Sequence, residues 1–180
     1  MTTTTVVSEK WDAVVRSCHW LVAIGFVMNR FIDEPGDTVH VWIGWSIAAL
    51  VVIRLLWGLL PASGPARLNQ FFPWPQAIWA HLQDLRARKP HTKLGHNPLA
   101  GAIIWCFWLG MLGMAFTGWA IDHSSLSDSW PMEEIHETLA NILTVLVVLH
   151  LLALGFMSWW CRFNYLKTMK PEFHNRNKAQ

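Results

Sequence analysis

The sequence predicts an all-α membrane protein: one domain, residues 1–180, built as a bundle of four transmembrane helices with both termini in the cytoplasm. Three observations support this fold class. The composition is 53% hydrophobic and 14% charged, which is far from that of an average soluble domain. Four stretches reach the roughly 20 apolar residues that a bilayer-spanning helix needs. The connecting segments differ in the sign of their charge.

The four apolar stretches cover residues 13–32, 39–60, 99–121 and 135–160. The first is the least apolar, because it includes Arg16, His19, Asn29 and Arg30. We expect it to span the bilayer with these side chains facing a polar or ligand-filled bundle interior. No small-residue cleavage site follows a short apolar core, so a retained first helix is expected rather than a signal peptide.

Acidic side chains gather in the connections 33–38 and 122–134, where Arg30 is the only positive group nearby. The other thirteen Lys and Arg residues lie in the remaining segments. By the positive-inside rule, the termini and the connection 61–96 are cytoplasmic. Residues 74–89 predict a short interfacial helix, although a polar loop with scattered apolar residues also fits them. The net charge of +2 is too small to indicate a nucleic-acid partner.

Histidines carry the first functional signal, because four of the nine lie in or at the ends of apolar stretches: His19, His40, His136 and His150. An ionisable side chain there is costly unless it is bound to something. His136 and His150 are fourteen residues apart on one helix, so they lie about 21 Å apart and within about 40° of the same face. This helix therefore offers two ligands at two depths.

Depth alone predicts how these histidines pair. His136 lies near the outer surface, level with His40 at the start of the second helix. His150 lies towards the cytoplasm, level with His19 in the first helix. The predicted pairs are His40 with His136 (outer) and His19 with His150 (inner).

Paired imidazoles on facing helices are typical ligands for the two axial positions of haem iron. The three cysteines form no CxxCH motif, so the predicted cofactors are two noncovalent haems b. A purely structural role, in which each histidine only packs and forms hydrogen bonds, is less consistent with four histidines at two matched depths. A nonhaem metal transporter would be expected to have carboxylates at mid-depth, and Glu137 lies at the outer end of its helix.

Arginines match the same two depths. Arg54 lies fourteen residues after His40 and Arg30 eleven after His19, which predicts contacts with the propionates of the inner and outer haem. Arg16, one turn before His19, is a third candidate. Gly44, one turn after His40, leaves room for a flat ring to approach the backbone.

The motifs around these residues resemble the bacterial cytochrome b561 and nickel-iron hydrogenase b-type cytochrome subunit family over nearly the whole chain. The matching motifs are Trp11-Asp12, Arg16-Ser17-Cys18-His19-Trp20, Val39-His40-Val41-Trp42-Ile43-Gly44, Arg54-Leu55-Leu56-Trp57-Gly58, Gly95-His96-Asn97-Pro98-Leu99 and His136-Glu137-Thr138-Leu139-Ala140. The resemblance implies a multi-pass protein of the bacterial inner (cytoplasmic) membrane, with two haems b held by the same two histidine pairs.

With both axial positions filled, outer-sphere electron transfer is favoured over chemistry at iron. We expect transmembrane electron transfer in a respiratory chain, between the quinone pool and a redox protein such as a c-type cytochrome or a dehydrogenase subunit. The alternatives are a superoxide oxidase of the cytochrome b561 type, acting as a quinone-linked oxidoreductase, and a nonredox anchor or sensor.

The predicted quinone site lies near His150, with His96 and Asn97 as polar contacts. Asn97-Pro98 also fits an ordinary helix start. No fifth helix is predicted after residue 160, whereas some hydrogenase subunits carry one, and this counts against a hydrogenase partner.

Overall fold

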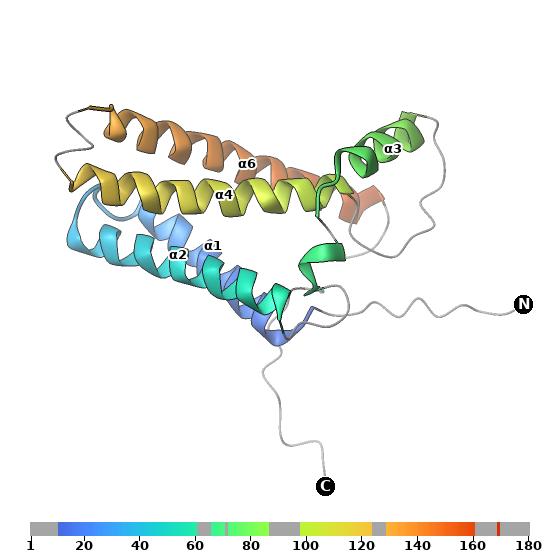
Figure 1. Cartoon of the computed structure of the whole chain (residues 1–180), viewed down its shortest axis with the longest axis horizontal. Coiled ribbons are helices and arrows are strands. Elements are labelled where there is room, and N and C mark those ends of the chain that lie inside the picture. Colours follow the sequence, from blue (N-terminus) through green and yellow to red (C-terminus); the bar gives the residue numbers. More distant parts are fainter. Residues whose placement is uncertain are drawn as a thin grey trace, which may run out of the picture.

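The computed structural model describes residues 11–60, 66–70, 72–86, 98–123, 129–160 and 169. The regular elements within these residues are all helical, as predicted (Figure 1). Their bounds are α1 Ala13–Phe31, α2 Thr38–Leu59, η2 Leu68–Gln70, α3 Pro75–Arg86, α4 Pro98–Ile121 and α6 Met132–Trp160. The four predicted apolar helices correspond to α1, α2, α4 and α6, and each boundary differs from the prediction by at most three residues.

Three helices in the described part of the chain are long and apolar enough to cross a bilayer: Thr38–Leu59, Ala100–Ile121 and Met132–Trp159. Helix α1 has 19 residues and is not among them. Its polar residues, including Arg16, Asn29 and Arg30, lower its hydropathy. The protein is therefore an all-helical membrane protein with three candidate spans among its described residues, and a fourth span through α1 remains a prediction.

Helix starts follow local sequence signals. The Asp12 side chain accepts a hydrogen bond from the Val15 amide at 2.8 Å and caps α1, as an N-cap aspartate commonly does. Helices α3 and α4 begin at proline, a residue suited to the first helical position. The helix predicted within residues 74–89 is confirmed as α3, although its position at a membrane interface is untested. Gly36 adopts φ +81° between α1 and α2, a conformation that glycine adopts without strain.

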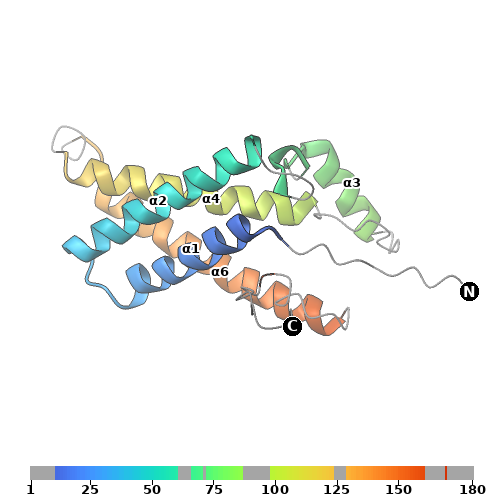
Figure 2. The same cartoon turned by 90° about the horizontal axis from the view of Figure 1, so that it is seen from below.

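Helices α1 and α2 pack against each other, as do α4 and α6, and α2 joins the two pairs by packing on α4. Figures 1 and 2 show each pair running antiparallel. Residues 32–37 and the described residues between α4 and α6, 122–123 and 129–131, therefore lie at one end of the bundle, here called the short-loop end. The start of α1, the ends of α2 and α6, and helix α3 lie at the opposite end, here called the terminal end.

A buried layer occupies the middle of the bundle, formed by Ile47 and Val51 of α2, Met111 of α4 and Leu143 of α6. Leu143 is 1% exposed and fits against Gly110, where an added Cβ would lie 2.7 Å from the Leu143 Cδ2. Glycine at this position lets α4 and α6 approach closely. We call these four residues the central layer.

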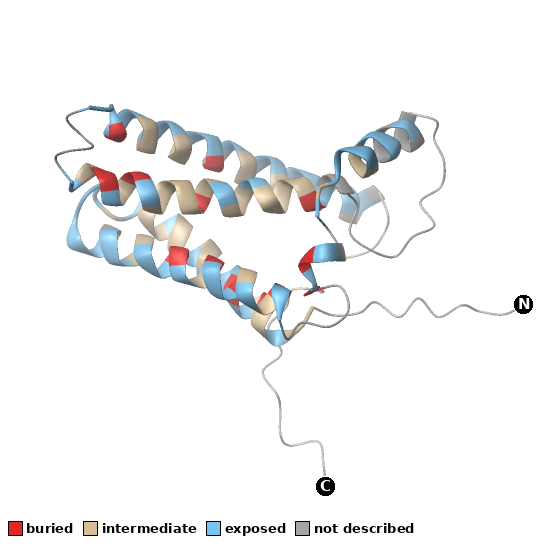
Figure 3. Cartoon of the chain, viewed as in Figure 1, coloured by how far each residue is buried: buried red, intermediate tan, exposed pale blue. Residues whose placement is uncertain are grey.

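Many residues on the outside of the helices are exposed (Figure 3), and a large number of these exposed residues are apolar. Trp42 is 70% exposed and Leu152 is 63% exposed. Apolar exposure on this scale marks a surface that another apolar phase covers. For long apolar helices, that phase is lipid.

Candidate functional site

The structure brings His40 and His136 together near the short-loop end. His40 lies in the first turn of α2 and His136 near the start of α6. Their ring centroids are 6.3 Å apart and their planes are inclined by 58°. Two imidazole nitrogens that each lie about 2 Å from one shared metal ion place their ring centroids about 6 Å apart. The observed separation therefore suits a single metal ion between the two rings.

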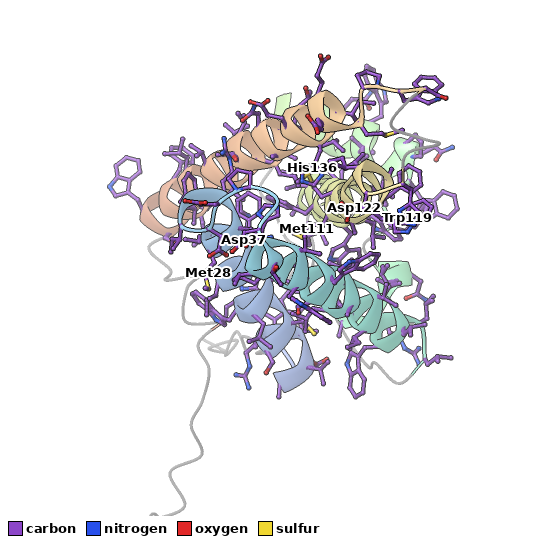
Figure 4. All side chains as sticks on the ribbon, turned by 90° about the vertical axis from the view of Figure 1, so that its left-hand side faces the viewer. Met28, Asp37, Met111, Trp119, Asp122 and His136 are labelled. Carbon is purple, nitrogen blue, oxygen red and sulfur yellow. The ribbon has the colours of Figure 1, made fainter. Side chains whose placement is uncertain are left out.

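The His136 ring is held from α4. Its Nδ1 lies 2.8 Å from the hydroxyl of Thr117, which is 4% exposed. Gly118 lies against the same ring, because a Cβ added there would be 3.4 Å from the His136 Cε1. The view onto the short-loop end shows His136 projecting from α6 towards α4 (Figure 4).

The surroundings of His40 are more open. Its backbone carbonyl accepts a hydrogen bond from the Asn29 amide at 2.9 Å. Its ring Nδ1 is buried and has no hydrogen-bond partner among the described residues. A Cβ added at Gly44, one turn along α2, would meet only the Asn29 Nδ2, at 3.7 Å. Space is therefore available beside the ring of His40.

The second pair lies nearer the terminal end, where His19 of α1 is close enough to His150 of α6 for their charges to interact. Both rings contact an aromatic ring edge to face. His19 lies 5.4 Å from Trp20 with an interplanar angle of 87°. His150 lies 6.0 Å from Phe107 with an angle of 86°. The structure thus places His40 beside His136, whereas the pairing of His19 with His150 stays a prediction.

The central layer separates the two histidine levels. Leu143 is seven residues from both His136 and His150 along α6, so it lies about two helical turns from each. No group of three or more His, Cys, Asp or Glu side chains that could hold a metal ion occurs in the described ranges. The donor set on view is two separate imidazole pairs, which is the set that haem iron takes.

The predicted propionate contacts have protein partners of their own. Arg30 of α1 donates to the Asn141 Oδ1 at 2.8 Å and to the Thr144 Oγ1 at 3.2 Å, both on α6. Arg54 is 6% exposed, donates to the Ala66 carbonyl at 3.0 Å and lies 5.5 Å from the Trp108 ring centroid.

The two remaining predicted site residues are Arg16 and Asn97. Arg16 is partly buried in the first turn of α1. Asn97 and the neighbouring His96 lie outside the described residues, although α4 begins at Pro98 as the helix-start interpretation predicts. Contacts of any of these arginines with a propionate remain predictions.

Sequence reasoning missed the polar contacts that hold α4 and α1 to α6. Thr117 is the only hydroxyl residue in α4, and a lone polar side chain in an apolar helix was the available signal. Asn141 and Thr144 gave a similar signal, because they are polar side chains within the apolar run of α6. Their partners could not be named from the sequence, because depth along a helix does not tell which neighbour each face contacts.

The family model described as "Prokaryotic cytochrome b561" matches residues 10–172. The chain belongs to the prokaryotic cytochrome b561 family. The family resemblance drawn from the sequence motifs is thereby confirmed. Membership makes the chain a membrane-embedded b-type cytochrome of electron transport, and a b-type cytochrome carries haem b.

Curated relatives of this cytochrome b561-family chain include proteins named "Probable Ni/Fe-hydrogenase 1 B-type cytochrome subunit" from Escherichia coli strain K12 and from Escherichia coli O157:H7. Each is 24% identical over 158 residues, covering 71% of this chain and 66% of the relative. The chain thus spans slightly less than two thirds of the length of these relatives. No solved structure matches the chain.

Haem b fits the short-loop pair on three observations. The ring centroids of His40 and His136 have the separation that one shared ion requires. The open side of Gly44 leaves space for a flat macrocycle against α2. The buried Nδ1 of His40 makes no hydrogen bond within the described residues, so no such bond fixes the orientation of this ring and it can turn towards a ligand.

Proposed function

We propose that this chain is a di-haem b cytochrome that carries electrons across the bacterial inner membrane, between the quinone pool and a redox protein partner. One observation carries the proposal: α6 bears His136 and His150 fourteen residues apart, and the ring of His136 lies 6.3 Å from that of His40 on α2. His40 and His136 are the proposed ligands of an outer haem, and His19 and His150 those of an inner haem.

The proposed topology has four spans, with α1 as the fourth, and both termini in the cytoplasm. Antiparallel packing of α1 on α2 supports this, because it sets α1 alongside a helix that meets the criteria for a span. The acidic connections share the short-loop end, and most basic residues belong to the other segments. The positive-inside rule then makes the short-loop end outer and the terminal end cytoplasmic.

In the proposed mechanism, the haems supply a one-electron carrier at each level. The four histidine imidazoles would hold the two haem irons, and iron held by two imidazoles would transfer electrons without binding a further ligand. The central layer keeps water out of the space between the levels. Arg30 is the proposed contact for an outer propionate, and Arg16 and Arg54 those for an inner one, because guanidinium groups bind carboxylates strongly.

A quinone site is proposed near His150 at the terminal end, with His96 and Asn97 as polar contacts. Its support is the family resemblance, since both residues lie outside the described ranges. The quinone headgroup would exchange electrons with the inner haem, and the outer haem would serve the protein partner.

The partner is proposed to dock at the short-loop end. Acidic residues of the described chain surround this end, and they would attract a basic surface and speed its association; they are Asp33, Glu34, Asp37, Asp122, Glu133 and Glu134. The names of the curated relatives mention a hydrogenase, which supports a redox enzyme as partner equally well. A superoxide oxidase would instead need a positive approach to the outer haem, and the acidic rim disfavours it.

Haem counting tests the cofactor proposal. The full chain, expressed with ample haem supply and purified, should give two haems b per chain in a pyridine haemochrome assay. His40→Ala and His136→Ala should each remove one and the same haem, as judged by the remaining midpoint potential. His19→Ala and His150→Ala should each remove the other.

His123→Ala is the matched control, because His123 belongs to neither pair and lies two residues beyond the end of α4, where its Nδ1 is 2.8 Å from the Trp119 carbonyl. It should retain both haems. A wild-type content of one haem, or loss of different haems by His40→Ala and His136→Ala, would overturn the assignment.

Electron-transfer assays test the physiological direction. A quinol should reduce both haems rapidly, and a basic soluble cytochrome should reoxidise them at a rate that falls with ionic strength. Rapid haem reduction by superoxide but not by quinol would favour the oxidase instead. A rate that is independent of salt would remove the electrostatic part of the docking proposal.

A further inference from the structure

The hydroxyl of Thr117 stands among three hydrogen-bonding groups within α4 and α6. It lies 2.8 Å from the His136 Nδ1, 3.0 Å from the Gly113 carbonyl oxygen and 3.1 Å from the Met114 carbonyl oxygen. The side chain is almost fully buried. Its contacts are therefore fixed by packing and hold a defined geometry.

The number of protons decides the direction of each bond. A threonine hydroxyl has one proton to donate and can accept in return. Carbonyl oxygens only accept, so the Thr117 proton satisfies the backbone of its own helix, a common arrangement for threonine in helices. The oxygen then presents a lone pair to His136, whose Nδ1 must carry the proton.

A proton on Nδ1 leaves the lone pair of the imidazole on Nε2, across the ring from Thr117. An imidazole binds a metal through the nitrogen that carries no proton, and the hydrogen bond at the other nitrogen sets which one that is. Gly118 adds a steric limit, because a Cβ added at this position would lie 3.4 Å from the Cε1 of the His136 ring. Thr117 and Gly118 together fix both the tautomer and the rotation of the His136 ring.

We propose that Thr117 is a positioning residue for the outer haem: its hydroxyl accepts a hydrogen bond from the Nδ1 of His136 and thereby directs the Nε2 of His136 to the iron. The proposal rests on the function proposed above. Hydrogen bonding at Nδ1 also strengthens the imidazole as an electron donor, which stabilises ferric over ferrous iron. Thr117 therefore lowers the midpoint potential of the outer haem.

The other three proposed ligands lack such a partner within the described residues. The Nδ1 of His40 has no hydrogen bond there, and His19 and His150 contact aromatic rings. The effect of Thr117 should accordingly be confined to one haem. This selectivity separates positioning from a general loss of bundle stability.

The test compares Thr117→Val with Thr117→Ser in the full, haem-loaded chain. Valine keeps the shape and removes the acceptor, whereas serine keeps the hydroxyl. For Thr117→Val we expect a raised midpoint potential of the outer haem, an altered low-spin EPR signal from the reoriented ring, and loss of that haem about 10- to 100-fold faster. Thr117→Ser should match the wild type in all three readouts, and the inner haem should be unchanged in both variants.

Each outcome decides between named alternatives. Wild-type potential, EPR signal and haem retention in Thr117→Val would overturn the inference and leave the di-haem proposal standing, as would equal defects in the serine and valine variants. If His136→Ala keeps both haems, the proposed function itself fails. If Thr117→Val yields no folded protein, Thr117→Ala gives the same comparison with serine and is interpreted in the same way.

Discussion

The two histidine pairs of this bundle are held in different ways. At the short-loop end, His136 is bound by a buried hydroxyl and a glycine of α4, and Asn29 of α1 bonds the backbone of His40. At the terminal end, His19 and His150 rest against Trp20 and Phe107. A hydrogen bond therefore orients one ring of the first pair, that of His136, while both rings of the second pair have aromatic contacts within the described residues.

The difference bears on how each haem would behave. A hydrogen bond sets a tautomer and a ring angle, whereas an edge-to-face contact restricts the ring without selecting a proton position. The outer site should thus hold its His136 ligand in one geometry. The inner site should tolerate more adjustment, which suits a haem that exchanges electrons with a small diffusible quinone.

Blocking the space beside His40 gives the largest expected effect. In Gly44→Leu, the new Cβ has the Asn29 Nδ2, at 3.7 Å, as its nearest neighbour outside the adjoining backbone of α2 among the described residues, so we expect the polypeptide alone to tolerate the change. A macrocycle in that space would clash, and we expect the haem count to fall from two to one with unchanged circular dichroism. Retention of both haems would mean that the outer haem does not approach α2 at Gly44.

Gly155→Leu is the control for this change. Gly155 also has open surroundings, with nothing within 4 Å of an added Cβ, but it lies beyond His150 on α6. Both haems should remain. A loss of haem in this variant would show that bulk at an open helix surface is harmful for other reasons.

A smaller effect is expected from Phe107→Leu at the inner site. This substitution removes the ring that contacts His150, a contact of about 1 kcal/mol. The inner haem should dissociate roughly fivefold faster, since 1.4 kcal/mol corresponds to a factor of ten, and the outer haem should be unaffected. Phe116→Leu, at an exposed position of the same helix, should leave both dissociation rates as in the wild type.

The smallest expected effect comes from Asn29→Ala. It removes the hydrogen bond to the His40 carbonyl, which also accepts within its own helix, and should lower the free energy of unfolding by about 1 kcal/mol. Thermal denaturation followed at the Soret band measures this change. Ser46→Ala is the comparison, because that hydroxyl donates only to Trp42 of α2, and its midpoint should stay within error of the wild type.

Much of this fold could be predicted because its signals are local or axial. Apolar runs located α2, α4 and α6 closely, and depth along the helices predicted that His40 would lie beside His136. The start of α6 was predicted at residue 135, three residues late, because Met132, Glu133 and Glu134 belong to the helix without being part of its apolar run.

Lateral relations could not be predicted in the same way. The contacts of Arg30 with Asn141 and Thr144 depend on where α1 lies around α6, which neither hydropathy nor depth encodes. Thr117 raises the same difficulty, since its role depends on the face of α4 that meets His136. The short loops constrain which helices are neighbours, but they do not fix how each helix is rotated about its own axis.

The central layer has a consequence for energy conservation. Ile47, Val51, Met111 and Leu143 are all apolar, and apolar space does not hold a chain of water molecules. In the proposed di-haem cytochrome, electrons would tunnel across this layer, whereas its side chains would offer protons no relay. Oxidation of a hydrogen-carrying substrate at one face would then release its protons on that face, so that each turnover separates charge instead of short-circuiting the ion gradient.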